Sequence, residues 1–186
     1  MARMTVFDEL ERAWANDRKA WRAVGEWADS PLLADRTPME LTVLAHEGSD
    51  RERTEAALAA LICRVGDDEL AGQTVMHMLL PAAKRLTARL ALDGDAAERA
   101  LMVVGALWGR IRTYPWQRRP GRVSGNVLAD VVMVTTRSQR QRSAPVVVWL
   151  DDIWVDGDDD EGWLSAKGWL VAQVAPSAGG TAQRSG

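Results

Sequence analysis

Apolar residues recur at intervals of three, four and seven along most of the first 140 residues of the chain. This spacing places them on one face of an α-helix, whereas a half-buried strand would alternate apolar and polar residues. In the first stretch the apolar positions are Phe7, Leu10, Trp14, Trp21 and Val24. The whole pattern predicts six helical stretches, at 5–28, 37–46, 49–65, 67–92, 95–111 and 120–137.

Polar residues mark where several of these helices begin. A Ser, Thr or Asp followed three residues later by Glu predicts an N-cap with a capping box. The pairs are Thr37 with Glu40, Ser49 with Glu52, and Asp95 with Glu98. Proline marks interruptions, since it has no backbone N–H to donate. We therefore expect Pro81 to kink or divide the helix at 67–92, and Pro115 to end the helix before it.

Beyond residue 142 the helical pattern stops. Residues 146–148 are three adjacent valines, the centre of a β-like run that is too solitary to make a sheet. The segment 175–186 has the composition of a disordered tail. We predict an all-α fold, a bundle of about six helices with a short extended segment and a disordered C-terminal tail. The predicted divisions are a helical region at 1–65, a second helical domain at 66–142, an extended acidic linker at 143–174 and the tail at 175–186.

Charge is distributed unevenly along the chain, although the formal net charge is only -3. Between Arg110 and Arg142 there are eight arginines and one acid, Asp130, which gives a local net charge of +7. Between Asp151 and Gly162 there are seven acids and no base. This separation indicates a region suited to a polyanionic partner, which the average charge hides.

Several kinds of chemistry are disfavoured by the sequence. The single cysteine, Cys63, lies in an apolar helical run, and His46 and His77 have no partner at zinc-ligand spacing. The acidic run at 151–162 lacks the ligand spacing of an EF-hand. Neither GxxxxGK[ST] nor GxGxxG occurs. We predict no catalytic residue, no metal and no cofactor, and therefore not an enzyme.

The sequence also bears on where the protein works. No apolar run is long enough to cross a bilayer, and the N-terminus turns acidic and helical too early for a secretory signal. One cysteine cannot form an internal disulfide, which suits a reducing compartment. We expect a cytoplasmic protein.

The arginine-rich region combines positive charge with aromatic rings. Binding of single-stranded nucleic acid requires cations for the phosphates and ring faces for unstacked bases, and both occur here at short spacing. An ordinary solvated helix surface would carry the same arginines without a partner. The candidate nucleic-acid-binding residues are Arg110, Arg112, Tyr114, Trp116, Arg118, Arg119, Arg122, Asn126, Arg137 and Arg140.

Residues 67–140 resemble the promoter-melting helical domain of bacterial sigma factors, especially the small extracytoplasmic-function type. The resemblance depends on LLPAAKRLTARL, on the Ala97–Glu98 dipeptide in an acidic turn, on a helix with Trp108 near its end, and on Asn126 with Asp130 before TTR. The chain is also similar to a group of uncharacterised actinobacterial proteins with a helical N-terminal region, an IRTYP loop and a C-terminal helix-turn-helix. Since residues 163–186 are too short for such a motif, we expect this end to be truncated or frameshifted.

The resemblance implies a function in transcription initiation or its regulation. The helix at 96–111 would dock on RNA polymerase, and the loop and helix at 113–137 would capture single-stranded DNA of a melted promoter. Asn126 matches an asparagine on the strand-facing helix, and Asp130 matches a residue that ties helices together. The acidic and amide positions of the polymerase-binding helix are replaced here by residues such as Leu101, Val104 and Gly105, which argues against polymerase as a partner.

A second interpretation stays open at this point. Trp14, Trp21 and Trp27 could form an exposed face of the N-terminal helix that binds another protein, without any nucleic acid. The two interpretations differ in which aromatic side chains lie on the surface.

Overall fold

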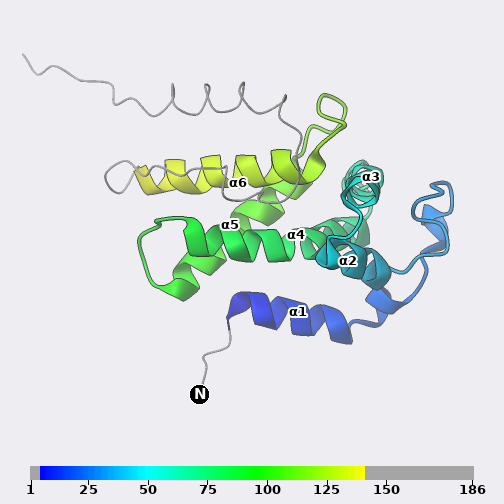
Figure 1. The fold of residues 1–186 in the computed structure, drawn as a ribbon, viewed down its shortest axis with the longest axis horizontal. Coiled ribbons are helices and arrows are strands. Elements are labelled where there is room, and N and C mark those ends of the chain that lie inside the picture. The colour runs from blue at the N-terminus through cyan, green and yellow to red at the C-terminus, as the bar shows by residue number, and fades with distance from the viewer. Residues whose placement is uncertain (1–4, 141–186) are drawn as a thin grey trace, which may run out of the picture. The chain divides into compact units, whose positions relative to one another are not determined.

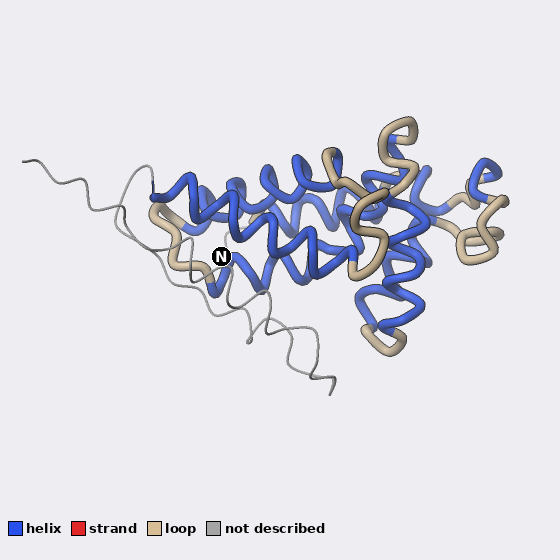
Figure 2. Tube along the Cα trace, turned by 90° about the horizontal axis from the view of Figure 1, so that it is seen from above, coloured by secondary structure: helices blue, strands red, loops and turns tan. Residues whose placement is uncertain are grey.

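The computed structural model describes residues 5–140, and these residues form helices and loops without a strand (Figures 1 and 2). The predicted all-α fold is confirmed, as is the number of about six helices. The predicted extended segment at 143–174 and tail at 175–186 lie outside the described residues. The α-helices are α1 (Val6–Asn16), α2 (Pro38–Glu47), α3 (Arg51–Ile62), α4 (Glu69–Arg89), α5 (Ala96–Arg112) and α6 (Val123–Arg140).

Helix α4 is the centre of the core. From Ala71 to Leu80 every residue except Gln73 is buried. Helices α1, α2, α3 and α5 all pack against it, and α6 packs mainly on α5 and α3. In Figure 1, α4 and α5 accordingly lie between α1 and α6. Helices from both sides of the predicted boundary at residue 65 therefore share one core.

Pro81 lies inside α4, but the helix runs unbroken from Glu69 to Arg89. Of the two expected outcomes, a kink or a division at Pro81, the division does not occur. Proline removes the N–H that would bond the carbonyl four residues earlier, which belongs to His77. His46 of α2 takes the place of that donor, with its Nε2 at 2.9 Å from the His77 carbonyl oxygen. The missing bond is thus replaced from a neighbouring helix.

Capping residues begin the helices much as the sequence predicts. Capping boxes form between Thr37 and Glu40 and between Asp95 and Glu98. Helix α3 differs from the prediction, because Asp50 and not Ser49 is its N-cap. The Asp50 carboxylate accepts the Arg53 N–H at 2.8 Å, and a carboxylate at this position also favours the positive end of the helix dipole.

The stretch 5–28 is not one helix. Helix α1 ends at Asn16, because the Asp17 side chain accepts the Lys19 N–H at 2.9 Å and starts a short 3₁₀ helix, Arg18–Trp21. A second short 3₁₀ helix, Gly25–Trp27, follows. Asp17, a polar residue between the apolar positions Trp14 and Trp21, is thus where α1 ends and the 3₁₀ helix begins.

The three N-terminal tryptophans do not share an exposed face. Trp14 is buried and donates from Nε1 to the Thr42 hydroxyl at 3.2 Å. Trp27 is fully buried and donates to the Asp68 carboxylate at 2.7 Å. Only Trp21 is exposed, at 58 %. Two of the three rings therefore stabilise the core, and the proposed tryptophan surface for a protein partner is absent.

Candidate nucleic-acid interface

The candidate site is the loop that joins α5 to α6. Helix α5 ends at Arg112, and Pro115 then accepts backbone N–H groups from Arg118 and Arg119 through its carbonyl oxygen, which makes a tight turn. Arg122 has a positive φ of 52°, and α6 begins directly after it. The helix predicted to start near Pro120 therefore starts three residues later, at Val123.

Tyr114 and Asn126 hold this loop together. The Tyr114 hydroxyl donates to the Arg119 carbonyl oxygen at 2.8 Å and accepts from the Asn126 amide nitrogen at 3.0 Å. The same amide nitrogen donates to the Gly121 carbonyl oxygen at 2.9 Å. Both amide protons of Asn126 are thus used inside the loop. Burial raises the pKa of the Tyr114 phenol above its ordinary value, so the hydroxyl stays protonated.

This arrangement corrects the predicted role of Tyr114. Its side chain is only 7 % exposed, so the ring cannot stack on a base while the loop keeps this conformation. Asn126 likewise positions the loop, because its donors are already engaged. Trp116 is the aromatic residue of the loop that reaches the surface, with 39 % of its area exposed.

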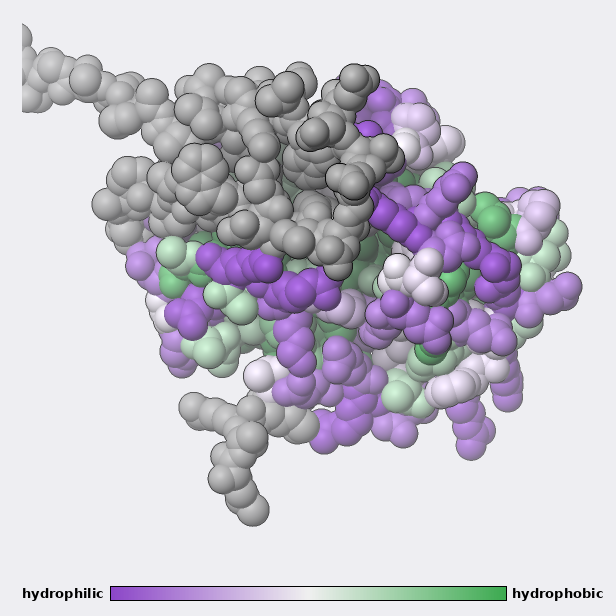
Figure 3. Space-filling model, viewed as in Figure 1, coloured by the Kyte–Doolittle hydropathy of each residue, from purple (hydrophilic) through white to green (hydrophobic). Residues whose placement is uncertain are grey.

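The arginines of the loop are mostly exposed. Arg112, Arg118, Arg119 and Arg122 lie on the surface, and Arg110 is partly buried. The Arg112 guanidinium lies 5.9 Å from the centre of the Trp108 ring, a cation–π contact within α5. The corresponding region, at the top of Figure 1, is hydrophilic in the space-filling view (Figure 3).

One arginine of the loop has an acidic partner. Arg119 lies 3.5 Å from Asp130 of α6, at the long end of an ion pair, and half of its side chain is exposed. The side chains of Arg118 and Arg122 form no ion pair with another residue of the described chain. An exposed ion pair as long as that of Arg119 adds little stability. The guanidinium groups of Arg118, Arg119 and Arg122 are therefore all free to pair with an external anion.

The structure does not bring two of the predicted residues into this cluster. Arg137 is exposed near the C-terminal end of α6, about 22 Å along the helix from Arg122 at the normal rise per residue. The side chain of Arg140 lies outside the described residues. The structure therefore gathers the candidates from 110 to 126 and separates Arg137 from them.

An acidic residue that the sequence analysis did not select helps to place α6. Glu55 of α3 accepts the Ser124 hydroxyl and, at 3.3 Å, the Ser124 backbone N–H. That N–H is one of those left unpaired at the start of any α-helix, where a negative charge is also favoured. Glu55 and Ser124 are 69 residues apart, so no local pattern reveals the contact.

Metal chemistry and membrane insertion find no support in residues 5–140. No group of three or more His, Cys, Asp or Glu side chains in this range could hold a metal ion. None of the helices in the same range is both long and apolar enough to cross a membrane.

Comparisons with known proteins leave the site to be interpreted from its own geometry. The chain matches no family model, no curated protein and no solved structure. The resemblance to sigma factors therefore stays a prediction from the residues that carry it.

Proposed function

We propose that the loop between α5 and α6 binds single-stranded nucleic acid, as a sigma-like protein would bind the open strand of a promoter. The observation that carries the proposal is the exposure of three arginines and an indole on one fixed loop, with a fourth exposed arginine, Arg112, at the end of α5 directly before it. Residues 110–122 contain five arginines and no acid, a local charge of +5. Phosphates would pair with the guanidinium groups, and Trp116 would stack on a base.

Rigidity of the loop supports the proposal. Tyr114 and Asn126 fix the backbone from residue 114 to residue 121, so the cations need little ordering when an anion arrives. Binding that needs less ordering loses less conformational entropy. We leave RNA polymerase out of the proposal, because the acidic positions of the family's polymerase-binding helix are absent from α5.

Fluorescence anisotropy with a labelled single-stranded oligonucleotide and the matching duplex tests this function. With three or four phosphate contacts, the log-log dependence of affinity on salt should have a slope of about -2 to -3 for the single strand. Affinity should then fall roughly 20- to 50-fold between 50 and 200 mM salt. Binding that is equal for duplex and single strand, or insensitive to salt, would contradict the proposal.

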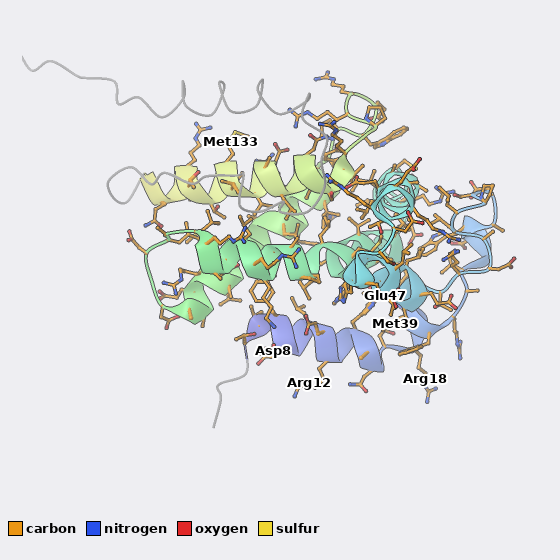
Figure 4. The ribbon with its side chains drawn as sticks, viewed as in Figure 1. Asp8, Arg12, Arg18, Met39, Glu47 and Met133 are labelled. Carbon is orange, nitrogen blue, oxygen red and sulfur yellow. The ribbon has the colours of Figure 1, made fainter. Side chains whose placement is uncertain are left out.

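Matched variants separate this loop from general positive charge. Arg118→Gln and Arg122→Asn should each reduce the salt slope by about 0.7, and asparagine suits the positive φ at position 122. The control is Arg12→Gln with Arg18→Gln. Both of these arginines are exposed and lie on the N-terminal part of the chain, away from the loop (Figure 4). The control pair should leave binding unchanged.

The aromatic contact has its own control. Trp116→Ala should weaken binding of the single strand by about 10-fold, within the range measured for loss of one stacked base. Trp21→Ala removes an indole that is even more exposed, at 58 %, in the N-terminal part of the chain and should have no effect. If both variants behave alike, Trp116 has no special role.

A further inference from the structure

A cleft opens between α1, α4 and α5, on the part of the protein formed by the N-terminal helix and the core. Its volume is about 440 Å³, and its walls are mainly apolar. Figures 1 and 4 show α1, which carries the labelled Asp8 and Arg12, running beside α4 and α5. The lining includes Trp14, Asp17, Met76, His77, Gly105 and Trp108.

His77 is the unusual member of this lining. It is 8 % exposed, and its ring stacks on Trp14 with centroids 4.4 Å apart and planes 11° from parallel. Its carbonyl is bonded to His46, but its ring nitrogens have no hydrogen-bond partner among the described residues. Burial, with a smaller effect from His46, lowers the pKa of His77 to about 4, so the ring is neutral near pH 7.

A neutral imidazole has one N–H donor and one acceptor nitrogen. Nearly all buried polar groups in folded proteins have a partner, and each exception requires an explanation. Here the unpartnered groups belong to a side chain that lines a cleft. The explanation that fits this position is a molecule in the cleft that bonds to the ring edge.

The other walls limit what this molecule can be. Aromatic side chains line the cleft from two helices, Trp14 from α1 and Trp108 from α5. Asp17 also lines the cleft, and a carboxylate there disfavours an anion. Gly105 leaves the α5 side open, because a Cβ atom there would meet nothing within 4 Å. The volume lies within the range of small-molecule sites and accommodates a one- or two-ring compound.

We propose that this cleft binds a small, uncharged, planar heteroaromatic molecule that packs against Trp14 and Trp108 and hydrogen-bonds to the imidazole of His77. The site shares no residue with the loop between α5 and α6, so the inference does not depend on the proposed nucleic-acid binding.

Isothermal titration calorimetry with benzimidazole at pH 8 tests the proposal, since this probe is planar, uncharged at that pH and carries one donor and one acceptor. For a ligand of this size we expect a Kd of about 0.1 to 1 mM with the wild-type protein. Gly105→Leu fills the cleft and should weaken binding at least ~10-fold. Gly109→Leu is the matched control, because it lies one helical turn away, lies outside the cleft lining and also meets nothing within 4 Å.

The hydrogen bond is tested separately. His77→Phe keeps the stacked ring but removes both nitrogens, and should weaken benzimidazole binding about 5-fold. Unchanged affinity in this variant would overturn the role of His77. Absence of heat with the wild-type protein at about 5 mM probe, or equal affinity for the two leucine variants, would show that the cleft holds only water and would overturn the proposal.

Discussion

Replacing His46 should destabilise the protein by an amount that depends on residue 81. Proline at this position leaves the His77 carbonyl without its helical donor, and His46 supplies one from α2 at 2.9 Å. His46→Ala removes that donor. Pro81→Ala restores a backbone N–H four residues after His77, so the carbonyl no longer depends on α2.

The magnitude follows from the surroundings of the bond. A buried carbonyl that loses its partner costs about 1 to 3 kcal/mol. The His46 side chain is exposed, so water can reach the site when it is removed, and we expect about 1 kcal/mol. In the Pro81→Ala background the same change should cost about 0.3 kcal/mol or less. The coupling energy between the two positions is then about 0.7 kcal/mol or more.

Urea denaturation followed by circular dichroism at pH 8 measures the four free energies of unfolding in this cycle. The high helix propensity of alanine raises stability in both Pro81→Ala variants and cancels from the coupling. Glu47→Ala, next in α2, is exposed and should cost the same with either residue at 81. Equal costs for His46→Ala in the two backgrounds would refute the explanation of how α4 tolerates its proline.

Three further predictions follow from particular positions. Burial lowers the pKa of His77 from 6.5 to about 4 in the folded protein. Between pH 7 and pH 5 this imidazole therefore becomes protonated in the unfolded chain but stays neutral in the folded one, which favours unfolding. The free energy of unfolding should fall by about 2 kcal/mol over this range. Urea titrations at both pH values should show this loss in wild-type protein and not in His77→Phe. Gly105→Ala should raise stability by about 0.5 to 1 kcal/mol, since a Cβ there meets nothing; Gly94→Ala should lower it, because φ is +94° and the new atom would lie 2.3 Å from a Glu98 oxygen. Thermal unfolding that ranks the two alanine variants the other way would contradict this. Tyr114→Phe should cost about 1 to 2 kcal/mol and weaken binding of the oligonucleotide, because it leaves the Arg119 carbonyl and one Asn126 proton unpaired; unaltered stability would show that the hydroxyl does not hold the loop.

The helices could be predicted because their signals are local. The capping box of Asp95 with Glu98 requires only residues three apart, and it forms as predicted. The same holds for Thr37 with Glu40. The sequence did not show that α4 continues through Pro81, because the compensating donor, His46, comes from another helix 35 positions earlier in the chain. A partner at that distance leaves no periodic trace in the sequence.

The candidate site shows the same limit at the level of side chains. The composition of residues 110–122, five arginines and two aromatic rings, is read from the sequence, but it does not tell which ring faces inward. Tyr114 follows the last turn of α5 and is drawn inside by its bonds to Arg119 and Asn126, whereas Trp116, two residues later, lies outside. Only the folded arrangement distinguishes the residue that builds the loop from the residue that could touch a ligand.

Because Glu55 of α3 bonds to Ser124 at the start of α6, the conformation of the arginine-bearing loop depends on α3. The C-terminal end of the loop is held by α3, and α3 packs against the central helix α4. Grafting residues 110–140 onto another scaffold would leave that anchor behind, and the start of α6 would lack its acidic acceptor. A fragment that is to keep the described conformation of this loop therefore needs α3 and α4 as well.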